Sequence, residues 1–178
     1  MNTKLRNNLT YSTNVHPSET LEEQYRYLSE YTIPINQRVF GENTVGPVSL
    51  RLGAKAASQL MSDEGQKRKF TDFVRSGNLN PVNINGFPFG NFHSEKVKDK
   101  VYLPDWTDDA RVEYTNNLSS LLSDWLPEHE TGSISTLAGK MKTTDWRAKA
   151  DRDSEMIARN LWHSALYCQD LYERTGKT

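Results

Sequence analysis

Residues 82–93 read VNINGFPFGNFH, and this stretch decides which fold the chain can adopt. Aliphatic side chains alternate with Asn83 and Asn85 up to Gly86, and this period of two predicts a β-strand with one polar face. Beyond Gly86 the stretch obeys no secondary-structure period, and it contains three phenylalanines and His93. We therefore expect a strand that leads into an aromatic loop.

The same strand-like character recurs in three other short segments, and a longer helix-like segment follows each of the four. The predicted strands lie near residues 9–16, 47–52, 81–86 and 132–137. The predicted helical segments are residues 18–40, which Pro34 is expected to end or kink, 54–78, 108–126 and 151–174. Strict alternation of strands and helices favours a parallel sheet with right-handed crossovers. We therefore predict a single α/β domain over residues 1–178.

Two parallel architectures fit this alternation, an open doubly wound sheet and part of a (β/α)8 barrel. An open dinucleotide-binding sheet usually has a glycine-rich phosphate loop after its first strand, and the sequence TNVHPSE has none. Polar residues at alternate strand positions, such as Asn83 and Asn85, indicate that one face of the sheet meets water or a ligand. A barrel with a functional lumen fits that pattern better than a sheet covered on both faces. The prediction is four βα units that form half of a (β/α)8 barrel.

The composition excludes several classes of partner and of site. The net charge is −1, with 22 basic and 23 acidic residues, so nothing favours nucleic acid or an anionic membrane as a partner. A single cysteine, Cys168, excludes an intrachain disulfide and a cysteine-based zinc cluster, and it fits a reducing compartment. No apolar run approaches the roughly 18 residues of a membrane helix, and the N-terminus lacks the apolar core of a signal peptide. The chain is therefore predicted to be soluble and cytoplasmic.

Four segments of the sequence resemble the N-terminal half of EboE-type metabolite-traffic proteins. They are LTYSTNVHPSETLEE, VSLRLGAKAA, NINGFPFGNFHSEKVKDKVYLPDW and GSISTLAG, and the run from Asn83 to Trp106 is the most specific of them. That family belongs to the xylose isomerase-like (sugar-phosphate isomerase/epimerase) barrel superfamily. The resemblance implies a barrel fold and a role in small-molecule binding or metabolite trafficking.

The resemblance assigns no metal ligand to this sequence. In the superfamily, carboxylates and histidines on later strands of the barrel hold a divalent metal, and none of the four predicted strands corresponds to those. A metal site is expected only if a partner chain or a second copy supplies the ligands. Ser12 stands where the family pattern is expected to have cysteine, which puts any thiol role at that position in doubt.

Two histidines are the candidates for catalysis. His16 ends the first predicted strand and His93 ends the loop after the third, so a barrel would place both on the rim where functional residues gather. Imidazole can transfer protons near neutral pH or bind a metal. The alternative is that each histidine only hydrogen-bonds the backbone of its loop.

The other candidates are side chains that a polar ligand would need. Arg51 lies in an apolar strand and requires an anion, either on a ligand or on Glu19. The amides of Asn83 and Asn85 suit sugar hydroxyls, or they satisfy loop backbone. Aromatic residues of the loop form an apolar wall for a ligand or cap the barrel core. The full predicted ligand-binding set is Asn14, His16, Arg51, Asn83, Asn85, Phe89, His93, Trp106 and Ser135.

A four-stranded half-barrel exposes two sheet edges, and soluble proteins avoid such edges. We expect a homodimer that closes the barrel about a two-fold axis. The alternatives are docking on a separate chain that carries the C-terminal half, or a chain that curls differently into a compact open α/β domain. Three functions remain as alternatives: small-molecule binding or trafficking, a divalent-metal-dependent sugar or sugar-phosphate isomerase/epimerase-like enzyme, and a folded remnant without chemistry. Binding or trafficking ranks first because the metal-binding strands of the superfamily are not among those predicted.

Overall fold

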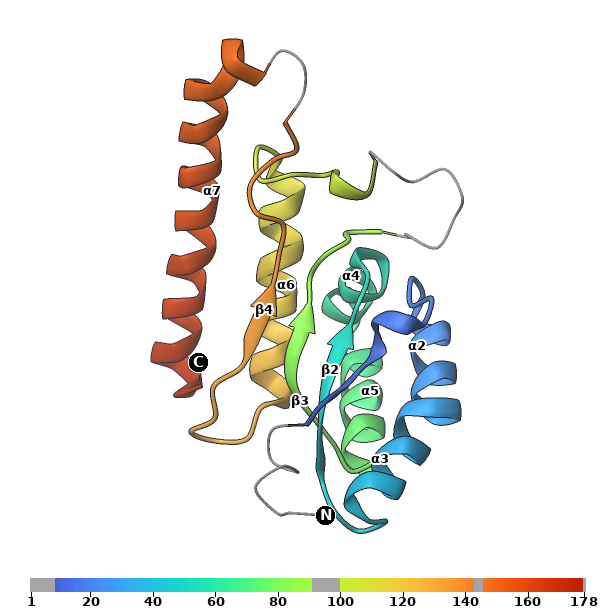
Figure 1. Cartoon of the computed structure of the whole chain (residues 1–178). Coiled ribbons are helices and arrows are strands. Elements are labelled where there is room, and N and C mark those ends of the chain that lie inside the picture. Colours follow the sequence, from blue (N-terminus) through green and yellow to red (C-terminus); the bar gives the residue numbers. More distant parts are fainter. Residues whose placement is uncertain (1–8, 91–99, 143–145, 178) are drawn as a thin grey trace.

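The computed structural model describes residues 9–90, 100–142 and 146–177 (Figure 1). Four strands form one parallel sheet in the order β1-β2-β3-β4. They are β1 (Tyr11–Ser12), β2 (Gly46–Arg51), β3 (Leu79–Asn85) and β4 (Ser133–Ser135). The predicted α/β class and the parallel sheet are therefore confirmed. β1 is shorter than predicted because the backbone leaves the strand at Thr13, in the tight turn Thr13–Val15.

Helices cover one face of the sheet, and no described helix covers the other face, the open face (Figure 1). In chain order they are α2 (Leu21–Tyr27), α3 (Ile33–Phe40), α4 (Ala54–Ser62), α5 (Glu64–Ser76), α6 (Asp109–Trp125) and α7 (Trp146–Thr175). In Figure 1, α4, α5 and α6 lie behind the sheet, α7 stands beside β4, and none of the helices described lies in front. None of them is long and apolar enough to cross a membrane.

The predicted helix 18–40 stays helical through Pro34, because a π-helical turn lies between two α-helices. A capping box starts α2, in which Thr20 Oγ1 accepts from the Glu23 amide and the Glu23 carboxylate accepts from the Thr20 amide. A π-helical turn over Leu28–Thr32 then joins α2 to α3, with Pro34 in the first turn of α3. Proline lacks an amide hydrogen, and the start of a helix is where that loss costs least.

The predicted helix 54–78 is divided into α4 and α5, because Asp63 is the N-cap of a second helix. Its carboxylate accepts hydrogen bonds from the amides of Gly65 and Gln66, at 2.9 and 3.0 Å. The Asp63 backbone is extended, with φ of −135° and ψ of 97°, which is incompatible with a continuous helix. A local side-chain hydrogen bond thus overrides the helical pattern on either side.

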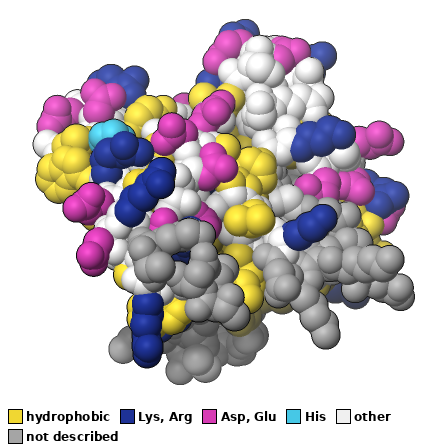
Figure 2. Space-filling model, turned by 90° about the horizontal axis from the view of Figure 1, so that it is seen from above, with side chains coloured by type: hydrophobic (Ala, Val, Ile, Leu, Met, Phe, Trp, Pro, Cys, Tyr) yellow, Lys and Arg dark blue, Asp and Glu magenta, His cyan; other side chains and the backbone are white. Residues whose placement is uncertain are grey.

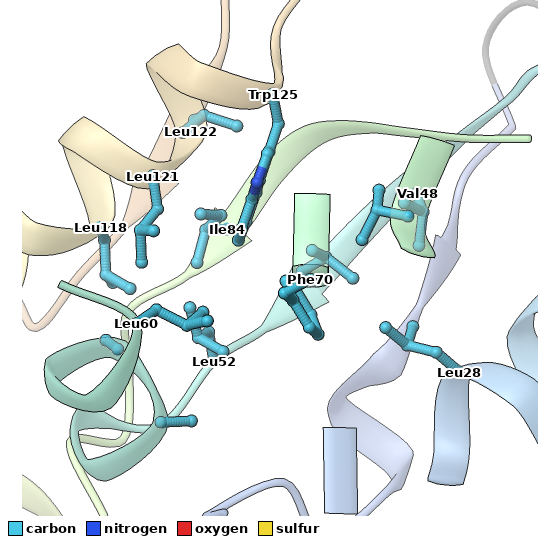
Figure 3. Close-up of a cluster of buried hydrophobic side chains, with 14 of the residues drawn as sticks. Leu28, Val48, Leu52, Leu60, Phe70, Ile84, Leu118, Leu121, Leu122 and Trp125 are labelled. Carbon is cyan, nitrogen blue, oxygen red and sulfur yellow. The ribbon is translucent and has the colours of Figure 1, made fainter. Parts of the chain in front are cut away.

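The hydrophobic core lies between the covered face of the sheet and the helices (Figure 3). Val48 and Ile84 project from β2 and β3 toward Phe70 of α5 and Leu118 of α6, and all four are at most 1% exposed. Trp125, at the end of α6, packs against Phe70 with ring centroids 5.6 Å apart. This core fixes which face of each strand is buried, and therefore which face is free.

Replacing Leu118 by alanine should lower the free energy of unfolding by roughly 2–5 kcal/mol, because it leaves a cavity at the centre of this core. Urea denaturation measures the change. Leu103→Ala is the matched control, since Leu103 is 58% exposed and should change stability by less than about 0.5 kcal/mol. Equal losses in the two variants would contradict the assigned core.

The capping box makes the stability of the folded chain depend on pH. Hydrogen bonds from the amides of Thr20 and Glu19 hold the pKa of the Glu23 carboxyl below its ordinary value of 4.5. A lowered folded-state pKa means that the stabilisation is complete above pH 4.5 and is lost as the pH falls through the lowered pKa. Glu23→Ala should therefore cost about 1 kcal/mol at neutral pH and progressively less in acid. Glu22→Ala, an exposed neighbour in the same turn, should show no such convergence with the wild type in acid.

Candidate functional site

The open face of the sheet carries hydrogen-bonded rows of polar side chains. In the first row, Ser49, Asn83 and Ser133 lie side by side on adjacent strands. The Ser49 hydroxyl donates to Asn83 Oδ1 at 2.6 Å, and Asn83 Nδ2 donates to Ser133 Oγ at 2.9 Å. This row is on the face opposite Val48 and Ile84, because side chains alternate along a strand.

The second row lies two residues closer to the carboxyl ends of the strands. Arg51, Asn85 and Ser135 are neighbours in the strand register. The Ser135 hydroxyl donates to Asn85 Oδ1 at 2.9 Å, and the Phe87 amide donates to the same oxygen at 3.0 Å. The structure thus brings together four of the residues predicted from the sequence, which are Arg51, Asn83, Asn85 and Ser135.

Arg51 is fully buried, and its charge is matched within the chain. Nη2 donates to Glu19 Oε1 and to the Gly90 carbonyl, both at 2.7 Å. Nη1 donates to the Ser18 carbonyl at 3.2 Å. The ion pair with Glu19 is one of the two arrangements expected from the sequence. It joins the end of β2 to the segment before α2 and to the loop after β3.

His16 is buried in a cage of tyrosines at the β1 edge. Its Nε2 lies 2.8 Å from the Tyr11 hydroxyl, and its ring stacks on Tyr27 with centroids 4.9 Å apart. Tyr31 adds a third ring at 4.8 Å. Burial raises the pKa of the Tyr11 hydroxyl, to which Tyr31 adds a smaller effect. Asn14, in the turn before His16, has a buried side-chain oxygen that accepts no hydrogen bond from the described residues.

His93 lies outside the described residues, so its place relative to His16 stays a prediction. The aromatic residues that are described pack against separate partners. Phe89 meets Tyr114 edge to face, with centroids 5.0 Å apart. Trp106 is 1% exposed, and its indole N–H donates to the Leu137 carbonyl at 2.9 Å. Trp106 thus joins the segment before α6 to the segment after β4, and its polar atom is already bonded within the chain.

Arg111 is a structural residue that belongs to none of the sequence motifs. It is fully buried at the start of α6, and it donates to the carbonyls of Gly86 and Pro104, each at 2.8 Å. These are the two ends of the long aromatic loop, so one guanidinium holds both. Burial lowers the pKa of Arg111. Its position on the helix face of Thr115 and Leu118 could have indicated burial, since residues three or four apart share a face.

Figure 2 shows the molecule from above, the direction in which the strands of Figure 1 run toward their carboxyl ends. Acidic and basic side chains are interspersed there, with apolar side chains between them. Within the described ranges, no group of three or more His, Cys, Asp or Glu side chains is placed to hold a metal ion.

Comparison with known proteins adds no relative. No protein-family model matches the chain, and no curated protein and no solved structure matches it significantly.

A double-mutant cycle on Arg51 and Glu19 tests how the carboxyl end of β2 is held. Glu19→Ala should cost roughly 3 kcal/mol in the free energy of unfolding, because it leaves a fully buried guanidinium without its carboxylate. The Arg51→Met/Glu19→Ala pair should be more stable than the sum of the single losses predicts, because neither charge then remains. Chemical denaturation measures all four proteins. Additive losses would show that the ion pair contributes no coupling.

Proposed function

We propose that the chain binds a small polar metabolite on the open face of its sheet, at the carboxyl ends of the strands. The observation that carries this proposal is the pair of polar rows on β2, β3 and β4. Ser133 and Ser135 are exposed, and Asn83 and Asn85 are half-buried, so a ligand can reach them. Ligand sites in parallel α/β proteins lie at the carboxyl ends of the strands.

The chemistry of the two rows favours a hydroxylated ligand. Hydroxyl and amide groups both donate and accept hydrogen bonds, as sugar hydroxyls do. Asn85 Nδ2 donates no hydrogen bond to any described residue, so it has a donor to offer. The one cation in the rows, Arg51, is already paired with Glu19. A neutral polyol or sugar therefore fits better than a ligand recognised through its phosphate alone.

The architecture that we propose for this site is half of a (β/α)8 barrel, with the polar rows facing the lumen. The consecutive strand order β1-β2-β3-β4 supports it, because a barrel adds its strands in chain order. A second copy or a separate chain with the other four strands would complete the ring. Binding or trafficking of a metabolite in a reducing, cytoplasmic compartment agrees with the resemblance to EboE-type proteins.

Removing either amide should weaken ligand binding without unfolding the protein. The ligand panel is a set of hexoses, pentoses, polyols and their phosphates, screened by thermal shift and confirmed by calorimetry. The Asn83→Ala and Asn85→Ala variants should each weaken binding by about 5–100-fold, because each removes one or two hydrogen bonds of about 1–1.5 kcal/mol each. Calorimetry measures the dissociation constants.

Asn80→Ala is the matched control, because Asn80 lies on the same strand near its other end, bonded to Glu130. It should leave binding unchanged. Binding that survives both amide variants, or that weakens equally in Asn80→Ala, would refute the site. Metal analysis of the purified protein separates the isomerase alternative, which requires stoichiometric divalent metal and interconversion of an aldose and a ketose.

A further inference from the structure

An apolar groove runs between α7, α6 and the free edge of β4. It has a volume of about 480 Å³. Ile134 of β4, Leu122 of α6, and Leu161, Ala165 and Cys168 of α7 line it. α7 packs along α6 but contributes few buried side chains, and Leu161 and Tyr172 on its groove side are 41% and 51% exposed. An exposed apolar surface of this kind marks a contact with another molecule.

The groove can accommodate one more strand beside β4. In the described chain, β4 pairs with β3 alone, so its outer edge presents unpaired backbone groups to the groove. Ile134 points to the helix side, where it packs against the core. A strand added in parallel would pair with the edge of β4 and place alternate side chains beneath α7.

The opposite edge of the sheet has matching chemistry. β1 pairs only with β2 among the described strands. Large apolar side chains lie exposed around it: Leu9 is 43% exposed, Val15 66% and Tyr31 45%. Tyr11 is paired with Val48, so it points to the helix side, and Leu9 would point the same way if the added strand extended two residues before Tyr11. One edge therefore offers a strand with apolar side chains, and the other edge offers an apolar groove beside a strand.

We propose that the groove beneath α7 receives β1 of a second copy of this chain. A two-fold axis parallel to the strands makes the β4–β1 contact twice and closes an eight-stranded ring. The large side chains at each edge are about half exposed, so each edge offers on the order of 250 Å² of apolar surface. Each contact buries two edges and the ring has two contacts, so the dimer buries on the order of 1000 Å² before backbone pairing is counted. That is the scale at which specific interfaces begin. This inference rests on the half-barrel architecture proposed above.

The native thiol of Cys168 reports on the groove. The wild-type dimer should not be crosslinked by a short bismaleimide, because the two-fold axis keeps the two copies of Cys168 in separate grooves. Leu9→Cys should be crosslinked to a covalent dimer, because it places a thiol of one copy against Cys168 of the other. Ser62→Cys is the control, an exposed position at the end of α4 away from both edges, and it should stay uncrosslinked. Crosslinking of the wild type or of the Ser62→Cys variant would overturn the arrangement.

A second pair of variants tests the interface without crosslinking. Sedimentation equilibrium should show a dimer for the wild type and a monomer for Ala165→Asp, in which a charge enters the groove. Leu166→Asp is the matched control on α7, because Leu166 is 45% exposed and does not line the groove. Circular dichroism checks that both variants are folded. Three results would overturn the inference. They are a monomeric wild type, dissociation by Leu166→Asp alone, and occupation of the groove by a different chain. A monomeric wild type that still binds a ligand through Asn83 would leave the proposed function standing.

Discussion

The buried guanidinium of Arg51 is the interaction on which the carboxyl end of the sheet depends. A desolvated cation must be matched, and here the matching groups come from Ser18, Glu19 and Gly90. The chain before α2 and the loop after β3 are therefore drawn to the end of β2. Arg111 does the same for the two ends of the aromatic loop, through the carbonyls of Gly86 and Pro104. Two buried arginines thus bring segments distant in the sequence to one end of the sheet.

The two faces of the sheet follow from one alternation that was readable in the sequence. Asn83 and Asn85 are poor strand formers, and their regular spacing predicts a polar face from the sequence alone. The need of Arg51 for an anion was readable in the same way, and Glu19 is that anion in the structure. These predictions succeed because burial and charge are constraints that a strand imposes on its own residues.

Other features depend on contacts that no local pattern encodes. The break at Asp63 arises from two capping hydrogen bonds that compete with a continuous helical pattern. A ligand wall at Trp106 stays a prediction, but the sequence did not indicate that its indole donates to the Leu137 carbonyl or that Asn160 of α7 donates to the Trp106 carbonyl. Such a junction joins residues up to 54 positions apart. Spacing along the chain does not determine which distant backbone groups a buried side chain will satisfy.

The polar site and the sheet edges require different surroundings, although the same four strands form both. The polar rows need solvent and an open lumen, whereas the edges need cover, because unpaired strand backbone invites association. A second layer of helices over the polar rows would leave the backbone groups of the sheet edges unpaired. It would also block access to Asn85 and Ser135. Closing the sheet on itself meets both demands, since pairing removes the edges while the lumen stays open at the strand ends. In a two-fold ring the polar rows also recur across the lumen, so a ligand between them would meet hydroxyl and amide groups from both sides.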